Sequence, residues 1–270
     1  MGTTALIATG GLLAAGLIVS TLESYHWLAV EYRVKIADLP EAFDGFSILH
    51  LSDLHGRVGV FSWAPFQQWL ATADLVAVTG DLYSPTRPRR PLAQRLDALS
   101  APYGAYYVSG NHDYHQNRLA VEPWQPGARL LDNRVVPIQK NGETLLLAGL
   151  PDLVRGSPNW NQVLGVLRAS SHRAVLLSHR PDAWLLPGIE RVSLILAGHT
   201  HGGQVVLPGL GVLVRHTRIP EPYVAGRLES PGRPVLITSR GLGTSELPIR
   251  WGARPEVVRV VLETVDSRGT

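Results

Sequence analysis

Short apolar runs alternate with segments of helical spacing along most of the chain. Runs of the length of buried strands lie at 46–52, 74–79, 103–109, 143–149, 174–178, 192–197, 235–238 and 257–262. Apolar residues at helical spacing predict helices over 61–72 and 91–99. This alternation predicts an α/β domain whose later part is rich in strands.

The N-terminal segment has a different pattern. Residues 1–22 carry no charged side chain, and residues 3–22 are rich in Ala, Gly, Leu and Ile. A helix of about 20 residues spans the ~30 Å of a bilayer core. We therefore predict a single-pass membrane anchor over 1–23, a connecting segment over 24–44 and one globular domain over 45–270.

Two other interpretations of this segment stay open. A cleaved signal peptide would have Lys or Arg before the apolar stretch, and none is present. A buried core helix would show a polar face, whereas only scattered Thr and Ser occur here. Arg33 and Lys35 follow the segment, which favours a cytoplasmic domain, although the side of the membrane stays open.

Composition narrows the possible partners and ligands. The chain has 270 residues, of which 45% are hydrophobic and 17% charged, as expected for one globular domain. The net charge is +3 and the basic residues are scattered, so we expect no nucleic-acid partner, and no obligate protein partner is evident. Because cysteine is absent, any metal must be held by nitrogen and oxygen atoms.

Side chains that can bind metal follow the apolar runs directly. The five that do so are Asp53, Asp81, Asn111, His179 and His199. In open α/β sheets, ligands collect beyond the carboxyl ends of the strands. We therefore expect these side chains to meet at one edge of the sheets.

These residues belong to five short motifs. In order, they are Ser52-Asp53-Leu54-His55, Gly80-Asp81, Gly110-Asn111-His112-Asp113, Ser178-His179 and Gly198-His199-Thr200-His201. Each motif alone is common, but all five in this order form a specific signal. Carboxylate, amide and imidazole ligands together suit Mn, Fe, Zn or Co.

The ordered set resembles the calcineurin-like metallophosphoesterase superfamily. The resemblance spans residues 53–201, and the later Arg240-Gly-Leu-Gly-Thr-Ser stretch is similar to a bacterial branch that often carries an N-terminal anchor. It implies a four-layer αββα sandwich of two mixed β-sheets flanked by helices, here preceded by one transmembrane helix. Some members of that branch act on phosphodiesters or on the pyrophosphate of a lipid A precursor.

The resemblance also implies a role for each residue. Two divalent metal ions, with manganese favoured, would be held by Asp53, His55, Asp81 and His201 on one side and by Asp81, Asn111, His179 and His199 on the other. Asp81 would then bridge the two ions. His112 would protonate or stabilise the leaving oxygen, and Asp113 would orient its ring.

These expectations describe a di-metal hydrolase of a phosphodiester or pyrophosphate in or near a membrane lipid. One alternative is a tethered phosphatase or nucleotide phosphodiesterase with a soluble substrate. Another is a binding module, which would have lost ligands, and none is lost here. Candidates for phosphate contact are Arg57, Arg180, Arg240 and Arg250. We expect His50 to pack near the site and His216 to be solvated.

Overall fold

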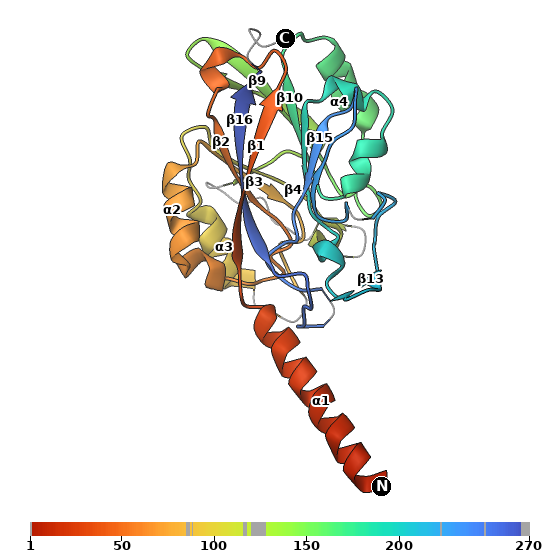
Figure 1. Ribbon diagram of the computed structural model, residues 1–270. Helices are drawn as coiled ribbons and strands as arrows, with labels where there is room; N and C mark the ends of the chain where they lie inside the picture. The colour runs from red at the N-terminus through yellow and green to blue at the C-terminus, as the bar shows by residue number, and fades with distance from the viewer. Residues whose placement is uncertain are drawn as a thin grey trace.

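Two six-stranded mixed sheets pack face to face in the computed structural model of the chain (Figure 1). It describes residues 2–84, 87, 89–115, 118–119, 128–221, 223–245 and 247–265. The first sheet has the order β1 (Leu28–Ile36), β16 (Glu256–Thr264), β2 (Ser47–Leu51), β3 (Leu75–Thr79), β4 (Ala105–Val108) and β7 (Ala128–Leu130). The second has the order β14 (Gly226–Leu228), β15 (Val235–Thr238), β11 (Leu194–Ala197), β10 (Ala174–Ser178), β9 (Glu143–Leu150) and β8 (Arg134–Lys140).

Helices cover the outer face of each sheet. Along β2, Ile48 packs in the core between the sheets, whereas Leu49 faces the other way, as the alternation of side chains along a strand requires. The outward face of the first sheet packs on α2 (Ala64–Thr72) and α3 (Arg89–Asp97). The second sheet packs on α4 (Trp160–Arg168) in the same way. The predicted four-layer αββα architecture is confirmed.

The structure differs from the prediction in several elements, and three of these differences have a clear physical reason. Segment 24–44 is more than a connection, because β1 pairs with β16 along its whole length. Strand β8 was not predicted because Pro137 interrupts its apolar pattern, and it lies at a sheet edge, where proline is tolerated. Helix α4 was not predicted either, since Gly165 in its interior lowers helix propensity.

Helix α1 (Gly2–Glu23) projects from the body of the molecule (Figure 1). Three of its described side chains, Leu17, Ile18 and Leu22, are 59%, 60% and 65% exposed. Within the described part of the chain, the structure contains no helix with both the length and the apolar character needed to cross a bilayer.

Strand directions place the carboxyl end of β2 beside α1. Strand β1 starts just after α1 and is parallel to β16, and β16 is antiparallel to β2. Strand β3 is parallel to β2, and β4 is parallel to β3, so both end at the same edge. The edge where the predicted metal ligands gather is therefore the end of the domain from which α1 leaves.

Two small hairpins complete the described structure. They pair β5 (Tyr114–His115) with β6 (Arg118–Leu119), and β12 (Val206–Leu207) with β13 (Gly211–Val212).

Candidate metal centre

Two groups of side chains come together beyond the carboxyl ends of β2, β3, β10 and β11. The first group is Asp53, His55 and His201, and the second is Asp81, His179 and His199. In each group the candidate ligand atoms lie within 4.8 Å of one another. All six side chains are buried except that of His199, which is half-buried.

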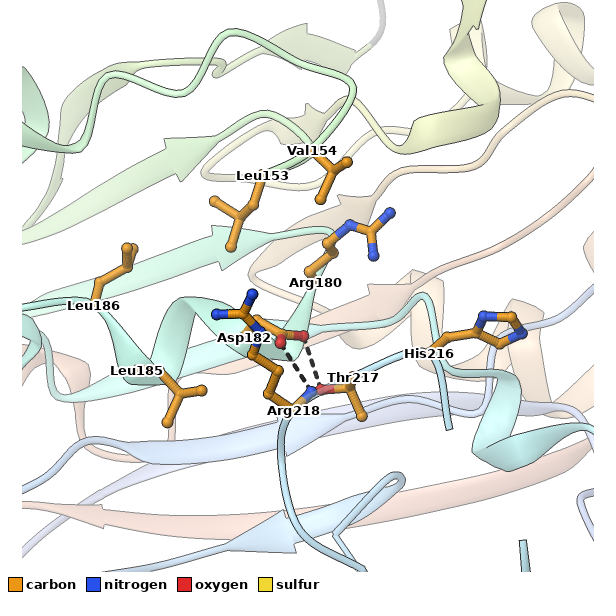
Figure 2. Close-up of a pocket in the computed structure, with 9 residues that line it drawn as sticks. All are labelled: Leu153, Val154, Arg180, Asp182, Leu185, Leu186, His216, Thr217 and Arg218. Atoms are coloured by element: carbon orange, nitrogen blue, oxygen red, sulfur yellow. Dashed lines mark hydrogen bonds between the residues drawn. The ribbon is translucent and has the colours of Figure 1, made fainter. Parts of the chain in front are cut away.

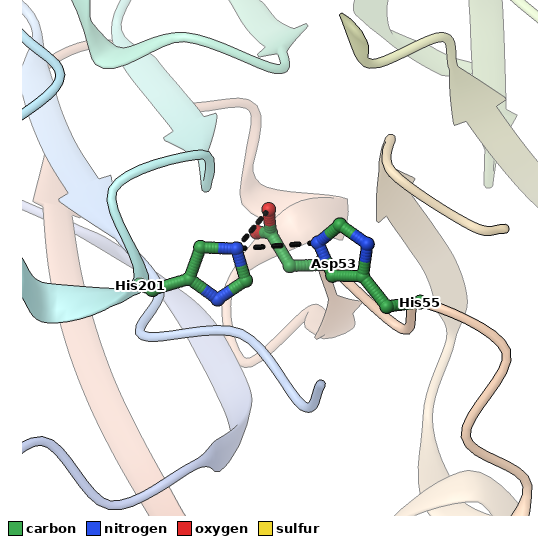
Figure 3. Close-up of side chains that lie close together, drawn as sticks. All are labelled: Asp53, His55 and His201. Atoms are coloured by element: carbon green, nitrogen blue, oxygen red, sulfur yellow. Dashed lines mark hydrogen bonds and ion pairs between the residues drawn. The ribbon is translucent and has the colours of Figure 1, made fainter. Parts of the chain in front are cut away.

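One carboxylate oxygen of the first group has no hydrogen-bond partner in the described structure and faces the His201 ring (Figure 3). Asp53 Oδ2 accepts hydrogen bonds from Ser52 Oγ at 2.6 Å and from the His199 backbone N–H at 3.0 Å. Asp53 Oδ1 is buried and accepts none, and it lies 3.5 Å from His201 Nε2. His55 Nε2 lies 3.2 Å from the same nitrogen. A cation among these atoms would satisfy the oxygen and both rings, so the donor set fits a metal ion.

The second group gathers around His179 Nε2. This nitrogen lies 3.4 Å from Asp81 Oδ2, 3.1 Å from Asn111 Oδ1 and 3.1 Å from His199 Nδ1. The predicted amide ligand Asn111 therefore joins the second group. This mixed set of oxygen and nitrogen atoms also fits a divalent metal ion.

Asp81 links the two groups. Its Oδ2 lies 3.7 Å from His55 Nε2 of the first group and 3.4 Å from His179 Nε2 of the second. Its Oδ1 accepts the backbone N–H of His112 at 2.7 Å, which fixes the carboxylate plane. One oxygen is thus shared between the groups, as a bridging ligand requires.

Burial keeps three of the candidate ligand histidines neutral at pH 7. It lowers the pKa of His55 to about 4 and that of His199 to about 2, and it lowers the pKa of His201 well below its usual value. Neutral imidazole is the form that binds metal. In His179, burial is outweighed by the Asp81 carboxylate, which raises the pKa to about 10. Asp81 thus lies next to a positive charge, the environment that a bound cation would provide.

The backbone at the ligands is strained. Five of them have positive φ: Asp53 at 51°, His55 at 44°, Asp81 at 53°, His199 at 70° and His201 at 52°. Non-glycine residues rarely adopt this region, at a cost of about 1–3 kcal/mol each, and such residues cluster at functional sites. Three of these residues, Asp53, Asp81 and His199, come two positions after the end of a strand.

Close backbone approach at the site requires glycine. A Cβ atom at Gly198 would lie 1.8 Å from Ser52 Oγ, and one at Gly110 would lie 2.3 Å from Asp81 Oδ1. The Gly-Asn-His and Gly-His-x-His motifs therefore need their glycines for space.

His112 and Asp113 are not arranged as a pair. The half-buried His112 ring has its centroid 5.0 Å from that of His55. The buried Asp113 carboxylate accepts backbone N–H groups from Gly110 at 2.8 Å, Asp81 at 2.9 Å and Leu82 at 2.8 Å. Both of its oxygens are therefore engaged by the turns that carry the ligands. This differs from the expected contact with the His112 ring.

Three of the four candidate arginines are structural. Arg250 is fully buried and donates to the carbonyl groups of His201 and Ala253, at 3.2 and 2.8 Å. Arg57 donates to the Ser24 carbonyl group at the end of α1. Arg240 forms an ion pair with the buried Glu256 carboxylate at 2.5 Å.

Arg180 is the candidate that lies beside the ligands. Its Nη1 is 2.7 Å from His199 Nε2, and its Nε is 2.6 Å from the buried carboxylate of Asp152. His216, expected to be solvated, is exposed, yet its ring centroid lies 6.0 Å from that of His199. No local pattern predicts this approach, because it depends on how the loop that carries His216 folds.

His50 packs behind the site, as expected. It is fully buried, and its Nε2 lies 2.8 Å from Thr79 Oγ1, which donates to Ser52 Oγ at 2.8 Å. Because Ser52 in turn donates to Asp53, a buried hydrogen-bond chain connects His50 to the first group.

The model of the calcineurin-like phosphoesterase family matches residues 46–203 of this chain. That match is more than half of the 270 residues and includes every predicted ligand. The chain belongs to the calcineurin-like phosphoesterase family. It is accordingly a phosphoric ester hydrolase that uses divalent metal.

Relatives from distant organisms agree with this family. The metallophosphoesterase YkuE of Bacillus subtilis is 30% identical over 95% of this chain and 95% of its own length. A Danio rerio transmembrane protein with metallophosphoesterase domain is 28% identical over 96% of this chain and 62% of its own length. The solved structure of Haemophilus influenzae NAD nucleotidase shares the fold, with a TM-score of 0.50 and 16% identity over 73% of this chain and 45% of that one.

Proposed function

We propose that the chain hydrolyses a phosphodiester or pyrophosphate bond with two divalent metal ions, manganese being the favoured ion, and that its substrate lies in or next to a membrane. The observation that carries this proposal is the position of Asp81 Oδ2 between the two ligand groups. A carboxylate oxygen shared in this way is suited to hold two cations against one phosphate group.

Each ligand group has its own part of the metal centre. Asp53, His55, Asp81 and His201 would hold one ion, and Asp81, Asn111, His179 and His199 would hold the other. Bound divalent ions polarise the phosphate oxygens and bring the pKa of water towards neutrality.

A side chain outside both ligand groups, His112, would act on the leaving group. The half-buried His112 ring lies beside the His55 ring without forming part of either group, and this suits a side chain that donates a proton to the leaving oxygen. Asp113 contributes indirectly, since its carboxylate fixes the turns that carry Asp81 and Asn111.

Helix α1 supports the membrane context. Its described C-terminal part exposes the consecutive apolar side chains Leu17, Ile18 and Val19, followed by Leu22. A contiguous exposed apolar surface usually marks a contact with protein or membrane. Arg57, two residues after His55, donates to the Ser24 carbonyl at the end of α1, so a membrane contact there would hold the metal centre near the lipid.

The alternative is a phosphatase or nucleotide phosphodiesterase that has a soluble substrate. Tethering raises the effective concentration of a membrane-borne substrate and gives no such advantage with a diffusing one. The exposed side of α1 therefore favours the first function.

The test is hydrolysis by purified protein loaded separately with Mn, Fe, Zn or Co. Substrates would be bis(p-nitrophenyl) phosphate, p-nitrophenyl phosphate and a lipid-linked pyrophosphate in vesicles. We expect the diester and the lipid pyrophosphate to be cleaved faster than the monoester, with Mn most active. Faster cleavage of the monoester, with no activity on vesicles, would favour the soluble-substrate phosphatase.

A variant tests the membrane contact without disturbing the C-terminal end of α1, which contacts the domain. Because Ser20 and Ser24 accept hydrogen bonds from Arg250 and Arg57, we would keep both and change Ile18→Asp with Leu22→Asp. The ratio of vesicle to soluble-diester turnover should fall about tenfold or more. An unchanged ratio would refute the membrane role of α1.

A further inference from the structure

A cavity of about 650 Å³ opens beside the second ligand group (Figure 2). Cavities of roughly 300–1,000 Å³ accommodate organic ligands of drug size. Its lining includes an apolar part, formed by Leu153, Val154, Leu185 and Leu186, and the basic residues Arg180, His216 and Arg218.

The cavity adjoins the second ligand group. Arg180 belongs to the cavity wall, and its Nη1 is 2.7 Å from His199 Nε2. His216 lines the same wall, with its ring centroid 6.0 Å from that of His199. A phosphate group on the second ligand group would therefore have its substituent at the mouth of this cavity.

The apolar part leaves hydrophobic area exposed to solvent. Val154 is 70% exposed and Leu185 is 45% exposed, and Leu153 and Leu186 beside them are only partly buried. Covering such side chains with an apolar group is favourable by about 0.8 kcal/mol per buried methylene. The wall is therefore suited to an alkyl or acyl chain.

The cavity is built from fixed parts. The Asp182 carboxylate accepts Thr217 Oγ1 at 2.7 Å and the Arg218 backbone N–H at 2.9 Å, which ties the 216–218 loop to the segment after β10 (Figure 2). Ile219, directly after this loop, is buried in the core. On the other side, Asp152 holds Arg180 through an ion pair at 2.6 Å. A preformed wall loses little conformational entropy when it binds a ligand.

Arg218 supplies a cation within the apolar part. Figure 2 shows its guanidinium on the side of Leu153 and Leu186, whereas Arg180 points towards the side of His216. Among the residues that the structure describes, no carboxylate forms an ion pair with the Arg218 guanidinium. A second anionic group on a ligand could pair with it.

We propose that this cavity binds the organic part of the substrate, and that this part is an apolar chain carrying a second anionic group that pairs with Arg218. The substrate class is then an amphiphilic diphosphate or an amphiphilic phosphodiester with a further acidic group. The inference rests on the proposed function and deepens it, because it assigns the specificity of the same site to four apolar residues and one arginine.

The first test varies chain length on one phosphodiester. Methyl, hexyl and decyl p-nitrophenyl phosphates, kept below their critical micelle concentrations, present the same scissile bond with different chains. We expect kcat/KM to rise at least about tenfold from methyl to hexyl, since five methylenes enter apolar surroundings. A flat series would overturn the proposal, even if all three esters were hydrolysed.

A pair of matched variants places the effect in the cavity. Leu185→Asp puts a charge on the apolar wall, whereas Val166→Asp does so at a similarly exposed position on α4, with Val166 48% and Leu185 45% exposed. The hexyl-to-methyl ratio should fall towards one in the first variant and stay at its normal value in the second. Equal ratios in the two variants would show that the alkyl chain does not bind in this cavity.

Binding measured by calorimetry separates this proposal from the proposed function. Hexyl and decyl phosphates and diphosphates would be titrated into the protein, without catalysis. We expect the diphosphate to bind more tightly than the phosphate, and Arg218→Gln to reduce that preference about threefold to tenfold, with Arg129→Gln on β7 as control. Binding that depends on chain length, without any hydrolysis, would support the cavity proposal and contradict the proposed function. Hydrolysis without dependence on chain length would support the proposed function and contradict the cavity proposal.

The same ligands distinguish a free amphiphile from a membrane lipid. Decyl diphosphate would be offered as monomer and then embedded in phosphatidylcholine vesicles. Preference for the vesicle form indicates a lipid source, and preference for the monomer indicates a soluble amphiphile. Failure of Leu185→Asp to weaken binding of either form would overturn the proposal.

Discussion

The two ligand groups share Asp81 but lie in different surroundings. The first group is closed off behind His201 by the fully buried Arg250. The second group is bordered by Arg180 and His216, which line an open cavity. Under the proposed function this difference implies a division of tasks, in which the fold would anchor the first group and the second group would face the substrate. Substitutions behind the first should therefore reduce stability, and those beside the second should alter substrate preference.

The largest expected effect comes from the residue that the groups share. Asp81→Asn removes the negative charge between them, and we expect hydrolysis to fall by about 10⁴-fold or more, with weaker occupancy of both metals. Turnover and metal content per chain, measured together, check this. Two metals per chain with near-normal turnover would refute the bridging role.

A smaller effect is expected from the side chain proposed for leaving-group protonation. His112→Ala should keep both metals and lose about 10² to 10⁴ in rate, the usual range for a positioned acid. The exposed His115, three residues away, is the control, and His115→Ala should change little. A larger loss for the His115 variant would show that the assignment is wrong.

The free energy of unfolding tests whether Arg250 anchors the first ligand group. Arg250→Met leaves the carbonyl groups of His201 and Ala253 without their donors, so the free energy of unfolding should fall by about 3–5 kcal/mol. Arg218→Gln, at an exposed cavity position, should change it by less than about 0.5 kcal/mol. Urea unfolding measures both. Similar small effects would mean that the first group is not anchored by Arg250.

The sequence predicted which candidate ligands come together better than it predicted the residues that support them. Asp53, Asp81, His179 and His199 could be placed because each follows an apolar strand, and strand ends meet at one edge. Nothing local reveals that Arg250 lies behind His201, because their contact depends on how distant loops fold over the strand ends.

Residue type also misled the prediction in specific places. Arginines were considered as phosphate ligands from their chemistry alone, but Arg57 and Arg250 satisfy backbone carbonyl groups. Asp113 was placed with His112 because they are adjacent in sequence, whereas its carboxylate accepts three backbone N–H groups. Strand β1 was taken as a connecting segment, because its partner in the first sheet, β16, lies more than two hundred residues away in the sequence.

The smallest expected effect concerns the contribution of His50, which packs behind the first ligand group, to the stability of the protein in acid. Burial lowers the pKa of His50 to about 3, and its Nδ1 has no hydrogen-bond partner in the described structure. In the unfolded chain the same ring takes up a proton near its ordinary pKa of about 6.5. Between these two values the unfolded state binds more protons than the folded state, so stability falls as the pH drops from about 6.5 towards 3. For His50 alone the loss between pH 6.5 and 5 should be about 2 kcal/mol.

His50→Gln isolates this contribution. Glutamine can still hydrogen-bond to Thr79 Oγ1 but does not titrate, so the variant should lose about 2 kcal/mol less than the wild-type protein between pH 6.5 and 5. Urea unfolding of the metal-free protein across this range gives the two curves, and other buried histidines contribute equally to both. The exposed His172 provides the control, since His172→Gln should leave the wild-type curve in place. Parallel curves for wild type and His50→Gln would mean that His50 takes up its proton at the same pH in the folded and the unfolded protein, which would refute the lowered pKa.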